Sequence, residues 1–143
     1  MVDSVVLTKQ DIVSVKNNYL SISESEMLEE NGNTIIDNLL FKEVNGWSVI
    51  INLEGDVFSE DFLLEFSRGE KLIYYYSNDS QLDCEFVVIN NNKIIRKRYI
   101  YMDTPELDED EGRLKCENKE LVEWNDLDYM IEIIHENPDI LFE

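Results

Sequence analysis

The chain has 143 residues, of which 43% are apolar, and its 32 acidic and 12 basic side chains give a formal net charge of −20. Nucleic acids and anionic membranes repel such a chain, so we expect neither as a partner, and we expect any electrostatic partner to be basic. The length predicts a single domain over residues 1–143, and the apolar fraction predicts that this domain folds. The lack of a signal-like or membrane-spanning apolar run predicts a cytoplasmic protein.

Two helices are expected in the first part of the chain. Thr8 can cap the first helix, with Asp11 in its opening turn. The apolar positions of that helix are Ile12, Val15 and Tyr19. A second helix is expected around residues 24–41, with Asn31-Gly32-Asn33 as an interruption that can split it.

The hydrophobic period then changes to that of a strand. In GWSVIINLEG, the side chains of Trp47, Val49 and Ile51 alternate with their neighbours, which predicts a strand with one buried face. The following segment, FSEDFLLEFSRG, predicts a short helix that Ser59 caps and Gly69 ends. Its apolar side is expected to lie on the sheet.

Three further strands are expected to form an antiparallel meander. They cover residues 71–77, 83–90 and 93–102. Asn91-Asn92 is expected to be a two-residue hairpin turn. This register places Glu85 opposite Arg98 and Val87 opposite Arg96, so the basic cluster RKR has an acid nearby and is interpreted as part of the sheet, not as a nucleic-acid site.

An acidic run, DTPELDEDEG, follows the meander. Residues 1–102 hold 17 acids and 9 bases, net −8, whereas residues 103–143 hold 15 acids and 3 bases, net −12. The run is interpreted either as a docking surface for a basic partner or as a solvated loop. Its acidic residues, the first candidates for partner binding, are Asp103, Glu106, Asp108, Glu109, Asp110 and Glu111.

The C-terminal segment predicts a helix over residues 126–136, with Asn125 as its N-cap and Pro138 just beyond its end. Trp124, on the approach to this helix, is a second candidate for partner binding. Aromatic side chains in polar surroundings often supply binding hot spots, and core packing is the alternative.

No reactive centre stands out in the sequence. Aligning Gly112 with the glycine of an EF-hand puts Leu107 at the first ligand position, so specific calcium binding is not expected. His135 is the only histidine, and Cys84 and Cys116 stand singly, as reduced structural thiols do. The chain has no nucleophile-elbow or phosphate-loop motif, so we predict a non-enzyme without catalytic residues, metal or cofactor.

The WSVI strand, the SEDFLLEFS helix and the meander, in a small acidic chain rich in Asn, Lys and Ile, resemble the immunity proteins encoded beside bacterial polymorphic or contact-dependent toxins. The resemblance covers residues 45–125. It implies an inhibitor that binds a cognate toxin domain in the cytoplasm of the producing cell, often by occluding a basic nuclease active site. It transfers no individual binding residue.

Together these features predict an α+β fold with a largely antiparallel sheet of about four to six strands and helices on one face and at the ends. The predicted function is that of a non-enzymatic acidic inhibitor that occludes a cationic nuclease toxin. Two alternatives stay open: a nucleic-acid mimic or regulatory decoy that binds a basic host protein, and an enzyme that uses carboxylates with Mg²⁺.

Overall fold

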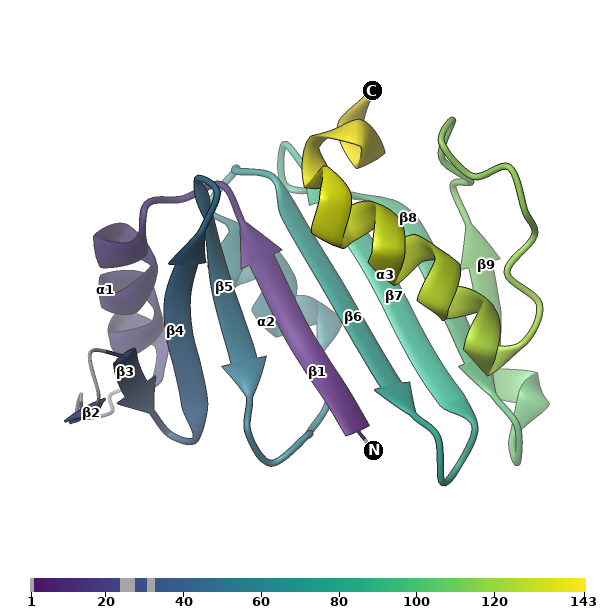
Figure 1. Cartoon of the computed structure of the whole chain (residues 1–143), viewed down its shortest axis with the longest axis horizontal. Helices are drawn as coiled ribbons and strands as arrows, with labels where there is room; N and C mark the ends of the chain where they lie inside the picture. The colour runs from purple at the N-terminus through teal and green to yellow at the C-terminus, as the bar shows by residue number, and fades with distance from the viewer. Residues whose placement is uncertain (1, 24–27, 31–32) are drawn as a thin grey trace.

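The computed structural model describes residues 2–23, 28–30 and 33–143 and contains one antiparallel sheet with helices on both faces (Figure 1). The strands are β1 (Val2–Thr8), β2 (Leu28–Glu30), β3 (Asn33–Ile36), β4 (Leu39–Val44), β5 (Trp47–Asn52), β6 (Leu72–Asn78), β7 (Asp83–Asn90), β8 (Lys93–Tyr101) and β9 (Glu109–Glu111). The helices are α1 (Ile12–Ser23), α2 (Glu60–Ser67) and α3 (Leu127–Glu136), with 3-10 turns η1 (Pro105–Leu107), η2 (Trp124–Asp126) and η3 (Pro138–Phe142).

The strand order is β2-β3-β4-β5-β1-β6-β7-β8-β9, so the first strand of the chain lies inside the sheet. Val5 of β1 pairs with Ile51 of β5 on one side and with Tyr75 of β6 on the other. The α+β class and the antiparallel sheet are confirmed. The expected number of about four to six strands is too low, because the described residues form nine.

Helices cover both faces of the sheet, and the prediction of helices on one face is wrong. Val15 of α1 and Leu63 of α2 belong to the core on one face, whereas Met130 and Ile134 of α3 belong to the core on the other. The strand β6 shows the reason, because apolar side chains point to both faces and both need cover. Its buried apolar residues are Leu72, Ile73, Tyr74, Tyr75 and Tyr76.

The prediction of a helix around residues 24–41 is also wrong. Part of that expectation, at residues 24–27 and 31–32, lies outside the described residues. Beyond them, β3 and β4 form a hairpin whose turn is Asp37-Asn38, with φ of 50° and 66°. The preceding helix α1 starts later than expected, because Thr8 ends β1 and Asp11 is the cap: its Oδ1 accepts the Ser14 N–H at 2.9 Å.

Two local predictions in the middle of the chain are confirmed. The Ser59 hydroxyl accepts the Phe62 N–H at the start of α2, at 3.2 Å, and left-handed Arg68 and Gly69 end the helix. Asn91 and Asn92 both have positive φ, 53° and 62°, as a two-residue turn between twisted strands requires.

The expected register between β7 and β8 is wrong by one residue. Ile89 pairs with Ile94, but Val88 pairs with Arg96, so one residue of β8 is inserted as a bulge. Such an insertion moves every later side chain to the opposite face. Glu85 therefore faces Tyr99, and Arg98 lies opposite Phe86 on the same face as α3.

The helix α3 begins one residue later than expected. Asn125 is not its cap; the 3-10 turn η2 precedes α3, and Glu123 and Asp126 form a capping box there. Of the helices in the described part of the chain, none has the length and apolar character needed to span a lipid bilayer.

Candidate functional site

The acidic run forms η1 and the edge strand β9. This strand pairs with β8, so that Lys97 lies opposite Glu111 and Arg98 opposite Asp110. The basic cluster of β8 thus meets the acidic run and not Glu85. A charged edge strand discourages pairing with a further strand, so the run has a role in the fold whatever else it binds.

Three of the candidate acids contact other residues of the protein through their side chains. Asp110 contacts Arg96 at 2.6 Å and Arg98 at 3.8 Å. The Asp108 carboxylate accepts the Tyr101 N–H at 2.7 Å. Glu109, which is half-buried, lies 3.8 Å from the Lys97 ammonium. Asp103, Glu106 and Glu111 are exposed.

The ion pair between Arg96 and Glu117 fixes the segment after β9 on the sheet. Their side chains are 2% and 1% exposed, and two parallel hydrogen bonds of 2.9 Å join the guanidinium to the carboxylate. Glu117 also accepts the Leu114 N–H at 2.6 Å. A planar guanidinium matches a carboxylate in this two-bond geometry, so Arg96 acts as a clamp between β8, β9 and the following loop.

The outer side of α3 carries a line of acids. Asp128, Glu132 and Glu136 are spaced four residues apart and are all exposed, so they lie on one side of the helix. We call these three residues the acidic ridge. The ten residues of α3 include no lysine or arginine. The negative charge of the C-terminal part of the chain is therefore displayed both by β9 and by α3.

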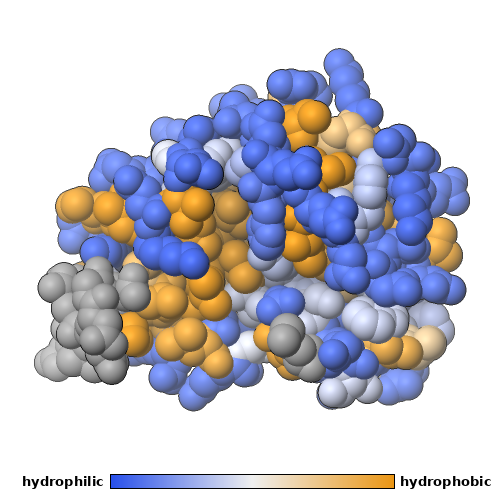
Figure 2. Space-filling view, in the orientation of Figure 1, coloured by the Kyte–Doolittle hydropathy of each residue, from blue (hydrophilic) through white to orange (hydrophobic). Residues whose placement is uncertain are grey.

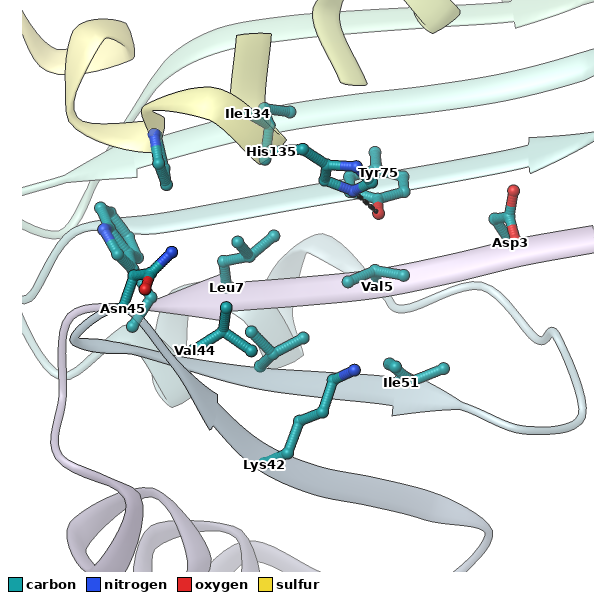
Figure 3. Close-up of a pocket in the computed structure, with 13 residues that line it drawn as sticks. Asp3, Val5, Leu7, Lys42, Val44, Asn45, Ile51, Tyr75, Ile134 and His135 are labelled. Carbon is teal, nitrogen blue, oxygen red and sulfur yellow. Dashed lines mark hydrogen bonds between the residues drawn. The ribbon is translucent and has the colours of Figure 1, made fainter. Parts of the chain in front are cut away.

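Beside α3, the sheet face over β4, β5 and β1 is hollowed into a groove of about 440 Å³. Figure 2 shows hydrophobic surface in this region, next to the largely hydrophilic surface around α3. We call this hollow the sheet-face groove. Its apolar lining is Val5, Leu7, Val44, Trp47, Val49, Ile51 and Ile134, and its polar lining is Asp3, Lys42, Asn45, Tyr75 and His135, with Pro138 (Figure 3).

Two polar groups of the groove are notable. The Tyr75 hydroxyl and His135 Nε2 are hydrogen-bonded at 3.2 Å, and burial raises the pKa of Tyr75 to about 12, so the hydroxyl stays protonated. Trp47 is 1% exposed, and its Nε1 is the one buried side-chain nitrogen or oxygen without a hydrogen-bond partner among the described residues. A buried N–H without an acceptor is costly.

Trp124 does not line the sheet-face groove. It lies on η2, is half-buried, and packs against the core on the α3 side of the sheet. The sequence candidates therefore differ in their surroundings. Three of the acids lie in the edge strand β9 and three lie before it, whereas the tryptophan contributes to a core.

A buried carboxylate lies between the sheet and α2. Glu85 is 8% exposed and accepts hydrogen bonds from the hydroxyls of Tyr74, at 2.9 Å, and Tyr101. Burial raises the pKa of Glu85 above its ordinary value, against the opposing effect of these hydrogen bonds. Burial also raises the pKa of the Cys84 thiol to about 12, which disfavours the reactive thiolate.

Within residues 2–23, 28–30 and 33–143, no group of three or more His, Cys, Asp or Glu side chains is placed to hold a metal ion. We therefore expect Ca²⁺ at physiological concentrations to leave the melting temperature unchanged. Thermal denaturation with Ca²⁺, with Mg²⁺ and with a chelator measures this. A saturable stabilisation by Ca²⁺ but not by Mg²⁺ would contradict it.

Comparisons of the chain with protein-family models, with curated proteins and with solved structures gave no match. The site is therefore defined by its own geometry. Sequence reasoning missed the sheet-face groove because it did not recognise β1, although the Val-rich VDSVVLT is typical of a strand. With β1 placed beside β5, the apolar side chains of Val5, Leu7 and Val49 come together on one face.

Proposed function

We propose that this protein is a non-enzymatic inhibitor that binds a basic partner protein in a one-to-one complex. The partner that fits best is the cationic nuclease domain of a cognate bacterial toxin, which the protein would neutralise in the cytoplasm of the producing cell by occlusion. The observation that supports this most strongly is the concentration of charge: residues 103–143, net −12, supply both β9 and the acidic ridge.

The physical reasoning starts from the partner. A nuclease holds phosphates with lysine and arginine side chains, so its active site attracts any densely negative surface. Complementary charge raises the rate of encounter, and a folded body seated on the active site excludes the nucleic acid without any turnover. The resemblance to immunity proteins agrees with this reading.

A nucleic-acid mimic or regulatory decoy is the second candidate, because spaced exposed acids also imitate a phosphate backbone. Its binding would be promiscuous and would weaken steeply with salt. The sheet-face groove favours the first candidate, since an interface with an apolar centre and a charged rim keeps much of its affinity in salt. A carboxylate and Mg²⁺ enzyme would instead show metal-dependent hydrolysis that a single carboxylate substitution abolishes.

The steering role of the acidic ridge can be tested with the triple variant Asp128→Asn, Glu132→Gln and Glu136→Gln. We expect its association rate with the toxin domain encoded in the neighbouring reading frame to fall roughly tenfold at low salt. Stopped-flow fluorescence measures the rate, and the difference should shrink as salt is added. These side chains are exposed, whereas neutralising Asp108 and Asp110 would also remove contacts that hold β9.

The matched control is Asp61→Asn, Glu65→Gln and Glu70→Gln. It removes two exposed acids of α2, which covers the other face of the sheet, and one exposed acid in the turn that follows α2. Its association rate should stay within about twofold of the unmodified protein, because the net charge changes equally but the local field at α3 does not. Equal slowing by both triple variants would mean that only net charge matters. If the protein forms no complex with any basic toxin domain, the proposed function itself is wrong.

A further inference from the structure

The sheet-face groove exists because α3 covers only part of its face of the sheet. In Figure 1, α3 crosses β6, β7 and β8, and β4, β5 and β1 lie beside it. In Figure 3, the side chains of Val5 and Leu7 rise from β1 toward Tyr75 and His135, and Lys42 reaches toward the same space from β4. The floor is thus apolar, and the polar groups lie around it.

We propose that the sheet-face groove receives a bulky apolar side chain from a segment of the basic partner, while lysine or arginine residues flanking that side chain contact the acids around the groove. This inference rests on the proposed function and identifies the apolar centre of its interface. At about 440 Å³, the groove lies within the size range of pockets that enclose ligand groups, about 300–1,000 Å³.

Charge complementarity selects this occupant. Asp3 is the acid that lines the groove (Figure 3). The helix α3 borders the groove through Ile134 and His135, and it carries the acidic ridge and no lysine or arginine. Lys9, near Trp47, contacts Asp139 at 3.6 Å and lies 4.8 Å above the indole ring. Cationic residues that flank an apolar anchor would therefore lie near Asp3 and in the negative field of α3.

The same charge disfavours the other occupants. A second copy of this chain would bring together two bodies of net charge −20, which repel each other. An apolar anion, such as a fatty acid, would enter the field of the same protein, with Lys42 as the lysine on the lining. A basic segment is attracted by that field and gains affinity from burying its apolar side chain, as interface hot spots do.

Two peptides of equal charge provide the first test: a lysine-rich peptide with a central tryptophan and leucine, and the same peptide with serine at both positions. We expect the apolar peptide to bind at least about tenfold more tightly, because burial of one large apolar side chain is worth roughly that factor or more. Fluorescence anisotropy at low and high salt measures both affinities. Only the apolar peptide should keep measurable binding at high salt.

The groove variants are Ile51→Arg, on the half-buried part of the lining, and Val44→Arg, which is 43% exposed and keeps the fold testable if Ile51→Arg does not fold. Each should remove the advantage of the apolar peptide. The matched control, Val13→Arg, makes the same charge change at a valine that is 63% exposed on α1, at the other face of the sheet. This variant should still bind the apolar peptide more tightly than the serine peptide.

The two tryptophans give an independent readout, because Trp47 lines the groove and Trp124 does not. In proton–nitrogen NMR spectra, the apolar peptide should shift the indole signal of Trp47 and leave that of Trp124 in place. Equal binding of the two peptides, an unmoved Trp47 signal, dimers through the groove, or occupation by oleate in place of the peptide would each overturn the inference. If the two peptides bind equally well and the ridge variant weakens binding of both, the groove assignment fails while the proposed function stands.

Discussion

Replacing Glu117 by Gln should lower the free energy of unfolding by about 3–5 kcal/mol, because it leaves the buried charge of Arg96 without its two-bond partner. The substitution keeps the size of the side chain, so a loss of packing contributes little. The carboxylate that remains near Arg96, that of Asp110, is 58% exposed and cannot replace a buried carboxylate. Urea denaturation followed by circular dichroism measures the change.

Glu120→Gln is the control, since this side chain is 75% exposed and lies 3.8 Å from Arg113. Its effect should stay within about 0.5 kcal/mol, as for other exposed pairs. The double variant Arg96→Met with Glu117→Leu should recover most of the stability lost in Glu117→Gln, because it buries no unpaired charge. A loss below about 1 kcal/mol for Glu117→Gln would show that Arg96 finds other partners.

The second large effect is expected at Glu85. Replacement by Ala leaves the hydroxyls of Tyr74 and Tyr101 without their acceptor, at a cost of about 1–3 kcal/mol for each buried group. Glu43→Ala is the matched control, because Glu43 is an exposed glutamate of β4; it should change the free energy of unfolding by less than about 0.5 kcal/mol.

Glu85→Gln adds a pH dependence with a defined sign. Because burial raises the pKa of Glu85 in the fold, its contribution to stability is fully present below the ordinary pKa of 4.5 and is lost as the pH rises through the folded pKa. Gln does not titrate, so the stability of the unmodified protein relative to Glu85→Gln should fall as the pH rises above about 4.5. A constant or growing difference would mean that the buried carboxylate is not disfavoured.

The sequence identified those elements whose signals are local. Ser59 and Gly69 mark α2, and Asn91-Asn92 marks the β7–β8 turn, because capping and positive φ depend on nearby residues alone. The prediction of a helix after α1 is wrong because apolar pairs four residues apart fit one face of a helix and also fit the two strands of a hairpin. Only the turn Asp37-Asn38 distinguishes them, and both residues tolerate positive φ.

Features that depend on distant residues could not be read from the sequence. The bulge in β8, opposite Val88 and Ile89 of β7, changes the partner of every residue in the basic cluster. The run of acids is visible in the sequence, but which of its members pair within the fold is not. Asp110 pairs with Arg96, whereas Asp103 and Glu106 are exposed, and this difference depends on where Arg96 lies. The sheet-face groove required β1 to be placed beside β5, a pairing between segments far apart in the chain.

The position of β1 also constrains how the molecule can be made. This strand emerges from the ribosome before both of its neighbours, and Val5 must wait for Ile51 and then for Tyr75 to be synthesised. Until then the apolar residues of β1 have no sheet to join. The pairing of β1 with β5 and β6 joins segments far apart in the chain, so it comes late in folding. The strands β2 to β5 form one antiparallel unit and β6 to β9 form another, and β1 joins the two units into one sheet.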